Sequence, residues 1–195
     1  MTRLLVFTWP YALCFWAVFI AAFGPESRVV SGKREPATTP HDAFSKPLIV
    51  VGQGVAIFAA FAIAIAVPSA ALPHRVRLFW LGLIAIAGGS LLRRHCFRML
   101  GSSFTGAVVV TPEQAVVERG AYRYVRHPSY TAGAIMFAGT GLALGNWIGI
   151  AVLMIVVAIA YGYRVRVEER ALAEVIGEPY RRYMRRTKRF VPFAF

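Results

Sequence analysis

The sequence contains little charge for its length. Charged residues make up 16% and hydrophobic residues 57% of the 195 residues, whereas a soluble domain carries about 25% charged and about 45–50% apolar residues. The mean hydropathy is +0.57. This composition excludes an ordinary soluble domain and indicates an integral membrane protein. With domains averaging about 150 residues, the chain has room for one membrane bundle and no separate soluble catalytic domain.

Acidic residues are scarcer still. The chain has 9 Asp and Glu against 22 Lys and Arg, a formal net charge of +13. In a soluble protein such an excess would suggest nucleic acid binding. In a membrane protein, basic residues flank the spans and face anionic lipid. We therefore expect membrane lipids as partners and no nucleic acid; the oligomeric state is not predicted.

The sequence also lacks the motifs of soluble cofactor sites. It has two cysteines, Cys14 and Cys96, and neither stands in a disulfide framework or a metal-ligand cluster. No second ligand stands at metal spacing from His41, His74 or His95, so no metal is expected. There is no G-x-G-x-x-G and no P-loop. Any cofactor must be held by loops and helix ends.

Long apolar runs predict the fold class. Residues 4–23, 48–67 and 78–92 predict three N-terminal spans, and residues 131–145 and 147–163 predict a transmembrane hairpin that turns at Gly145-Asn146. Segment 131–145 would be only about 22 Å long, so it must begin below the interface or thin the bilayer. We expect an all-α integral membrane protein of about five transmembrane helices. The proline-rich segment 24–47 predicts a loop whose function the sequence does not indicate.

Charge and glycine spacing add detail. Of the 22 basic residues, only Arg3, Arg75 and Arg77 lie outside segments 24–47, 93–130 and 164–195. The positive-inside rule then predicts an external N-terminus and a cytoplasmic C-terminus.

Two glycine groups favour close helix packing, namely Gly82, Gly88 and Gly89, and the pair Gly141 and Gly145. The arginine- and alanine-rich composition is typical of a high-GC bacterium, so we expect a bacterial plasma membrane.

Two polar segments could carry chemistry, both in the half formed by residues 93–195, whereas residues 1–92 hold the first three spans. Residues 120–130 stand directly before a span, where Pro128 fixes a bend and free helix amides can bind an anion. Their structural alternative is an aromatic and arginine-rich membrane edge. Arg164 and Glu168 are four residues apart on a continuing helix, and their structural alternative is an ordinary surface pair.

These segments make the sequence recognisable. The string Gly120-x-Tyr122-x-x-x-Arg126-His127-Pro128-Ser129-Tyr130, the turn Asn146-Trp147, Arg164-x-x-x-Glu168-Glu169, Gly177-Glu178-Pro179-Tyr180-x-x-Tyr183 and Pro192 resemble the isoprenylcysteine carboxyl methyltransferase family. Leu100-Gly101-Ser102-Ser103-Phe104 is similar to that family as well. The resemblance covers about residues 100–193; the first three spans are alike only in being hydrophobic.

The resemblance implies an integral membrane enzyme that transfers a methyl group from S-adenosylmethionine to a lipophilic acceptor entering from the bilayer. The cofactor pocket would be cytoplasmic, between segment 93–130 and the C-terminal helical segment. The implied cofactor-binding residues are Gln114, Ala115, Val116, Val117, Tyr122, His127, Pro128, Ser129, Tyr130 and Glu168. Gln114 departs from the histidine that the family commonly has there. Arg164 would bind the acceptor carboxylate, and Arg164 and Glu168 are the implied catalytic residues.

Other functions share this architecture. A phospholipid or small-thiol methyltransferase, or an NADPH-dependent membrane sterol-type reductase, would use a similar bundle, and binding of S-adenosylhomocysteine or NADPH distinguishes them. A small basic membrane scaffold would bind neither. Methyl transfer by in-line displacement needs positioning and exclusion of water more than acid–base help, which suits a site with few titratable groups. The acceptor itself is not identified by the sequence.

Overall fold

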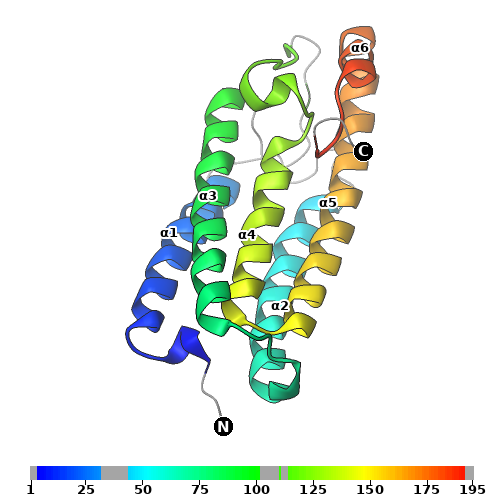
Figure 1. The fold of residues 1–195 in the computed structure, drawn as a ribbon. Helices are drawn as coiled ribbons and strands as arrows, with labels where there is room; N and C mark the ends of the chain where they lie inside the picture. Colours follow the sequence, from blue (N-terminus) through cyan, green and yellow to red (C-terminus); the bar gives the residue numbers. More distant parts are fainter. Residues whose placement is uncertain (1–3, 32–43, 102–109, 111–113, 192–195) are drawn as a thin grey trace.

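The computed structural model describes residues 4–31, 44–101, 110 and 114–191, and this part of the chain is helical (Figure 1). The elements are η1 (Leu5–Phe7), α1 (Tyr11–Ser31), α2 (Ser45–Ala66), η2 (Pro68–Ala70), α3 (Arg75–Leu100), η4 (Gly120–Arg123), α4 (Pro128–Leu144), α5 (Trp147–Val175) and α6 (Glu178–Arg186). The described residues form no β-strand and only two isolated bridges. The predicted all-α class is confirmed.

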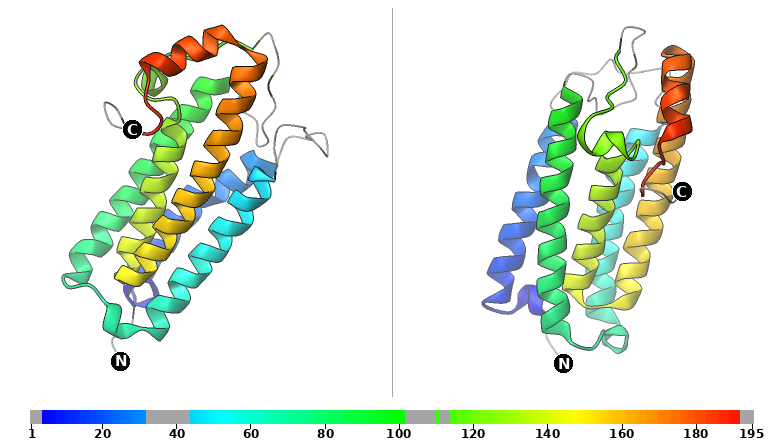
Figure 2. Two further views of the ribbon diagram at one scale, coloured as in Figure 1. Left: turned by 90° about the vertical axis from the view of Figure 1, so that its right-hand side faces the viewer. Right: turned by 45° about the horizontal axis from the view of Figure 1, so that its top comes forward.

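The long helices lie side by side in a bundle, seen from two further directions in Figure 2. Helix α3 packs along α4, and α2 packs along α5, while α4 and α5 also contact each other. Helix α6 and the segment before α4 lie at one end of the bundle (Figure 1). The turn between α4 and α5 lies at the other end. The topology therefore separates one polar end from one end made of short turns.

Three of the described helices are long and apolar enough to cross a membrane, namely α2, α3 and α5. The apolar part of α1, Tyr11–Pro25, and the 17-residue α4 are shorter. These helices support an integral membrane protein. The count of five spans and the division at residue 92 stay predictions.

The helix that carries the first predicted span, residues 4–23, has other bounds at both ends, and the extent of the span itself stays a prediction. Helix α1 begins only at Tyr11, after Pro10, and it continues through Pro25 to Ser31. Proline has no N–H, so Pro25 leaves the carbonyl of Ala21, four residues earlier, without its helical partner. The guanidinium of Arg94 on α3 donates to that carbonyl through Nη2. A contact between helices thus replaces the bond that the proline removes, and α1 does not end there.

The helix that carries the third predicted span, residues 78–92, extends beyond it at both ends. Residues 93–100 contain neither proline nor glycine, and α3 continues through them to Leu100. It stops at Gly101, whose φ of +55° suits glycine. Residues 93–100, predicted as the start of a polar loop, are therefore helical. The second span, predicted at 48–67, is α2, Ser45–Ala66, with Pro47 in its first turn, where a missing N–H costs nothing.

The predicted helical turn at Gly145-Asn146 is present, with an earlier start of its first helix, and that both helices cross the membrane stays a prediction. Helix α4 begins at Pro128, because a proline suits the first helical position, and it ends at Gly145, whose φ is +65°. Asn146 caps α5 by accepting from the Gly149 amide at 3.0 Å, and its side chain donates to the Val67 carbonyl at 3.0 Å. Helix α5 then continues through residue 163 to Val175 as one helix of 29 residues.

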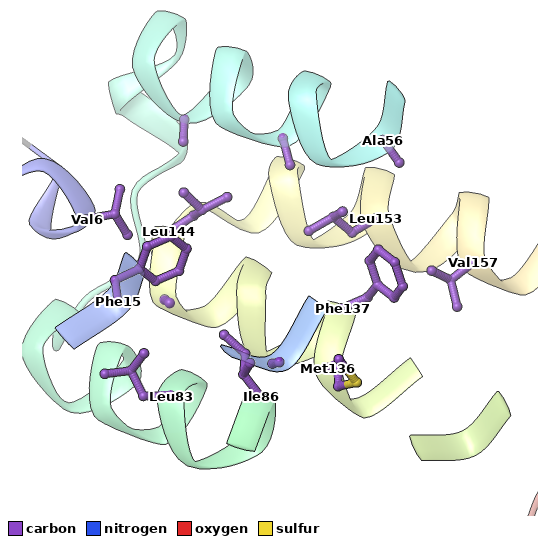
Figure 3. Packing of buried hydrophobic residues seen from close by; sticks show 14 of the residues in the cluster. Val6, Phe15, Ala56, Leu83, Ile86, Met136, Phe137, Leu144, Leu153 and Val157 are labelled. Atoms are coloured by element: carbon purple, nitrogen blue, oxygen red, sulfur yellow. The ribbon is translucent and has the colours of Figure 1, made fainter. Parts of the chain in front are cut away.

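Small residues bring α3 and α4 together, and the apolar core fills the bundle beside them (Figure 3). A Cβ on Gly82 would lie 2.5 Å from the Gly139 carbonyl, and one on Gly89 would lie 2.8 Å from the Ala132 carbonyl. The prediction is wrong for Gly88, which has open space. Gly141 contacts Ile150 on α5.

The Pro25 and Arg94 contact gives the first testable prediction. Arg94→Met should lower the free energy of unfolding by about 1 kcal/mol, because the Ala21 carbonyl loses the donor that replaces the missing helical N–H. In a Pro25→Ala background, where the helical N–H is restored, the same change should cost only a few tenths of a kcal/mol. A double-mutant cycle on thermal stability in detergent measures this coupling. Equal costs in both backgrounds would contradict the account.

Candidate functional site

The two polar segments meet at the same end of the bundle. Segment 120–130 leads into α4, and the charged part of α5 continues beyond residue 163 to α6 (Figures 1 and 2). His127 and Tyr130 from the first segment hydrogen-bond Glu169 and Glu168 from the second, at 3.2 and 2.9 Å. The expectation that these segments lie together at one end is confirmed by these contacts.

The residues before α4 are held in place by the chain that follows α6. The backbone amides of Arg126 and His127 donate to the carbonyls of Lys188 and Arg189 at 2.8 and 2.9 Å. The Thr131 hydroxyl donates to the Phe190 carbonyl at 2.8 Å. The residue before a proline is disfavoured in the helical region, and His127, with φ −127° and ψ 53°, lies outside it, so its amide pairs outside α4. The C-terminal segment is therefore part of the site.

A buried carboxylate joins these segments. Glu169 Oε1 accepts from Arg126 Nε at 2.8 Å and faces His127 Nε2 at 3.2 Å, while Oε2 accepts from Arg189 Nε at 2.9 Å. Arg126 also donates through Nη1 to the carbonyls of Met184, at 2.9 Å, and Thr187. We call Arg126, His127, Glu169 and Arg189 the Glu169 cluster. Glu169 is only 3% exposed, and the two guanidinium groups stabilise its ionised form.

A second set of polar residues connects α4 with α2 by way of α5. We call Tyr130, Arg164, Glu168 and Ser45 the Tyr130 chain. The Tyr130 hydroxyl donates to Glu168 Oε2 at 2.9 Å and accepts from Arg164 Nε at 3.3 Å. Arg164 Nη1 donates to the Ser45 hydroxyl at 2.6 Å. Tyr130 thus connects Arg164 with Glu168. Arg164 is 4% exposed, so it is a buried cation in a polar network and not one half of a solvated surface pair.

Helix α3 contributes a buried arginine that sequence reasoning missed. Arg93 Nη1 donates to the Ser129 carbonyl, in the first turn of α4, at 2.6 Å. Its guanidinium lies 4.9 Å from the ring centre of Phe97, a cation–π distance. A Cβ on Gly133 would lie 2.3 Å from the Tyr161 hydroxyl and 3.0 Å from Arg93. Arg93 can reach the α4 backbone because position 133 is a glycine.

Three tyrosines fix α6 and η4 to the site. The Tyr183 hydroxyl donates to the carbonyls of Tyr122 and Val125 at 2.6 and 3.4 Å. The rings of Tyr180 and Tyr183 lie 5.9 Å apart. Burial raises the pKa of all three tyrosines, Tyr122, Tyr180 and Tyr183, well above the ordinary value. Their hydroxyl groups therefore stay protonated at physiological pH, and the Tyr183 hydroxyl keeps donating.

Tyr122 has a different position from the other two tyrosines. Its hydroxyl is buried and has no hydrogen-bond partner in the part of the chain that the structure describes. Buried polar groups are rarely left unpaired. The unpaired hydroxyl, close in sequence to the His127 ring and the first turn of α4, suits a ligand with hydrogen-bonding groups such as a nucleoside or an amino acid. The residues present therefore fit a cofactor of the S-adenosylmethionine type.

The predicted site residues divide into two groups. His127, Ser129, Tyr130, Arg164 and Glu168 lie together with the contacts just described. Gln114, Ala115, Val116 and Val117 lie in the irregular segment before η4. Their side chains make no hydrogen bond to either set of polar residues among the described contacts. Pro128, as the first residue of α4, positions the helix end.

Sequence reasoning missed several residues. Glu169 was quoted only as part of a motif, yet it accepts more hydrogen bonds than Glu168. The signal that could have indicated Glu169 is the acidic pair Glu168-Glu169 in a basic segment. Ser45, Arg93 and Arg189 join the site from distant parts of the chain, and no local pattern indicated them.

Comparisons with known proteins agree with this geometry. A family model described as phospholipid methyltransferase matches residues 78–178, which include both polar segments. The chain belongs to this family. Curated relatives of this chain also support its resemblance to the isoprenylcysteine carboxyl methyltransferases.

Two of those relatives are named protein-S-isoprenylcysteine O-methyltransferase. The form B protein of Arabidopsis thaliana is 33% identical over 115 residues, covering 58% of this chain and 58% of the relative. The Schizosaccharomyces pombe protein is 30% identical over 106 residues, covering 53% and 45%. The family member thus spans about half the length of these relatives. A solved eukaryotic intramembrane isoprenylcysteine carboxyl methyltransferase has a similar fold, with a TM-score of 0.60 at 21% identity, over 93% of this chain and 63% of that one.

The Tyr183 contact gives the second prediction. Tyr183→Phe should lower stability by about 1–2 kcal/mol, because the buried Tyr122 carbonyl loses its donor. That loss corresponds to a fall of roughly 2–8 °C in the melting temperature. Tyr124→Phe is the matched control, since the Tyr124 side chain is exposed, and it should change little. Thermal unfolding in detergent compares the two, and equal melting temperatures would refute the role of Tyr183.

Proposed function

We propose that this protein is an integral membrane methyltransferase that transfers the methyl group of S-adenosylmethionine to the carboxylate of a lipophilic acceptor, of the isoprenylcysteine type. The observation that carries the proposal is the Tyr130 chain. It links a buried cation, Arg164, to a carboxylate, Glu168, at the polar end of an apolar helix. A buried arginine with oriented N–H groups suits an anionic acceptor, and the neighbouring carboxylate suits a cationic cofactor.

Cofactor binding is assigned to the residues around the start of α4. S-adenosylmethionine, when bound, supplies an electrophilic methyl group on a sulfonium. Tyr122 offers an unpaired buried hydroxyl, His127 and Ser129 lie at the helix start, and Glu168 offers a carboxylate for an ammonium group. Gln114, Ala115, Val116 and Val117 would line the cofactor from the segment before η4. Pro128 and Tyr130 complete the set by fixing the helix end and orienting Glu168.

Acceptor binding is assigned to Arg164. Its guanidinium carries N–H donors in a planar fork, a geometry that matches a carboxylate, and it donates to Tyr130 and Ser45. Tyr130 and Ser45 hold this fork at the end of the apolar part of α5, where a lipid would arrive from the bilayer. A carboxylate held there needs no proton removed before methyl transfer. Positioning and exclusion of water therefore provide the catalysis.

Membrane orientation follows from charge. The polar end with α6 carries most of the basic residues, while Arg75 and Arg77 lie at the start of α3, at the opposite end. We propose that the polar end, with the C-terminus, faces the cytoplasm and that the lipid acceptor and membrane lipids are the partners. The composition favours a bacterial plasma membrane as the location, whereas the relatives named above are eukaryotic proteins.

A phospholipid acceptor is the second candidate, favoured by the description of the family model. The two acceptors differ in the group that Arg164 would bind. In a lipid carboxylate that group is itself the methyl acceptor, whereas a phospholipid would place its phosphate at the arginine and its amine at the cofactor. The methylated product therefore distinguishes them. An NADPH-dependent reductase would bind NADPH in place of S-adenosylhomocysteine.

The third prediction separates the roles of Arg164 and Glu168. Arg164→Lys keeps the charge but loses the planar fork, so S-adenosylhomocysteine binding should stay near normal while methyl transfer falls strongly. Glu168→Gln should instead weaken cofactor binding by about five- to a hundredfold. Thermal shift in detergent measures cofactor binding. Methyl transfer from labelled cofactor into a lipid extract, followed by the mass of the product, measures turnover and identifies the acceptor.

The controls decide between the candidates. Stabilisation by NADPH and not by S-adenosylhomocysteine would refute the methyltransferase. Full turnover in Arg164→Lys would refute the binding of the acceptor carboxylate by the planar guanidinium group of Arg164. A labelled phospholipid amine as product would establish the second candidate.

A further inference from the structure

Glu169 touches His127 through one ring nitrogen only. His127 Nε2 lies 3.2 Å from Glu169 Oε1, and the His127 side chain is almost fully buried. A carboxylate that also accepts from two arginines is ionised and cannot donate. His127 Nε2 must therefore carry the hydrogen of this contact and donate it to Glu169 Oε1. In the neutral ring, Nδ1 is then the acceptor.

We propose that Glu169 is a positioning residue that holds His127 in its Nε2–H tautomer, so that Nδ1 accepts a hydrogen bond from a donor group on the cofactor. The donors of such a cofactor are hydroxyl and amine groups. This inference rests on the proposed function for the identity of the cofactor. The tautomer itself is a property of the protein without any ligand.

Other groups around His127 support this arrangement. Arg126 and Arg189 bind the same carboxylate and keep it charged. The backbone amide of His127 is already used by the Arg189 carbonyl. The His127 ring lies 5.7 Å from the Tyr130 ring and 6.2 Å from the Phe190 ring, centre to centre. The ring is thus held on several sides, and its orientation is fixed before any ligand binds.

The fourth prediction tests the tautomer directly. Nitrogen-15 NMR of the ligand-free protein in detergent should show His127 protonated on Nε2 and not on Nδ1. Glu169→Gln should give a mixture of tautomers. Arg189→Met is the matched control, because it removes another partner of the same carboxylate. It should lower the melting temperature but leave the Nε2–H tautomer, and an Nδ1–H tautomer in the unmodified protein would overturn the proposal.

Two substitutions distinguish the ring nitrogens in binding. His127→Asn places an amide oxygen near the former Nδ1, whereas His127→Gln places its amide near the former Nε2. S-adenosylhomocysteine affinity should fall less in His127→Asn than in His127→Gln, by about tenfold between the two. The reverse order would overturn the role of Nδ1. If neither variant nor the unmodified protein binds S-adenosylhomocysteine while the tautomer is as expected, the proposed function fails and the positioning by Glu169 stands.

An independent observation concerns α2. Gln53 lies on the same helix face as Ala56, Ala60 and Ala64, which are buried. Its amide nitrogen is itself buried and has no hydrogen-bond partner among the described residues. In a membrane-spanning helix an unpaired amide is costly, and such polar residues commonly mark substrate paths.

The register between α2 and α5 gives the depth of Gln53. Ser45 pairs with Arg164, a Cβ on Gly52 would contact Val156, and Gly149 contacts Ala60. The helices are therefore antiparallel, and Gln53 lies at the level of Val156. At 1.5 Å per residue, it lies about 12 Å from Ser45 along the helix. It is inside the apolar part of the bundle.

We infer that the Gln53 amide binds an oxygen in the tail of the lipophilic acceptor, about 12 Å from the carboxylate held by Arg164. The acceptor class is then a carboxylate lipid with an ether, ester or carbonyl oxygen along its tail. It keeps the carboxylate of the proposed function and differs from the isoprenylcysteine type in the tail, because an isoprenyl chain has no oxygen. This inference rests on the proposed function, because it uses Arg164 to place the carboxylate.

The fifth prediction uses a series of equally long lipid carboxylates in which one ether oxygen moves along the tail. The unmodified protein should show a KM minimum at one oxygen position, about tenfold below the oxygen-free chain. Gln53→Leu should remove that minimum and leave the KM of the oxygen-free chain unchanged. Gly54→Ala is the control, because position 54 has open space, and it should keep the minimum.

Two outcomes contradict different claims. A KM that is independent of oxygen position, or a minimum that survives in Gln53→Leu, would overturn the role of Gln53 while the carboxylate methyltransferase stands. If no member of the series is methylated although S-adenosylhomocysteine binds, the carboxylate acceptor itself is refuted. Should Gln53→Leu fail to fold, Gln53→Asn, which shortens the amide by one methylene, should move the minimum.

Discussion

The ionised carboxylate of Glu169 is the contact on which the polar end of the molecule depends. It accepts hydrogen bonds from the segment before α4 and from the segment after α6, and it stands on α5. A buried charge is expensive unless it is fully paired. Its partners cannot leave without a large cost, so these three parts of the chain are held in one arrangement. The geometry around His127 and Tyr130 follows from this arrangement.

The same end depends on the close contact of α3 and α4. Glycines at the contact allow the backbones to approach, and this brings Arg93 to the first turn of α4 and Arg94 to the carbonyl that Pro25 leaves open. The two adjacent arginines thus donate to backbone carbonyls of two different helices, Arg93 to α4 and Arg94 to α1. Both side chains come from a segment that looks, by composition, like a polar loop. The guanidinium groups of this segment donate to backbone carbonyls instead of to water.

Much of the fold could be predicted from the sequence, because apolar runs and turn residues are local signals. The hairpin at Gly145-Asn146 and the helical class needed only these signals. The continuation of α1 through Pro25 could not be predicted, since it depends on Arg94 from α3. The end of α3 at Gly101 had a local signal, because residues 93–100 lack proline and glycine, but the charge of that segment favoured a loop. In the site, Tyr130, Arg164 and Glu168 were indicated by motif and helical spacing. Glu169, Ser45 and Arg189 were not, because their roles arise only when distant segments meet.

The central claim is that one end of the bundle holds a cofactor at the start of α4 and an acceptor at Arg164. The most direct test is a structure of the protein in detergent or lipid with S-adenosylhomocysteine bound. The account predicts ligand density in contact with Tyr122, His127 and Glu168, with the sulfur facing the Arg164 guanidinium. Density that contacts none of these residues, or that lies at the opposite end of the bundle, would contradict it.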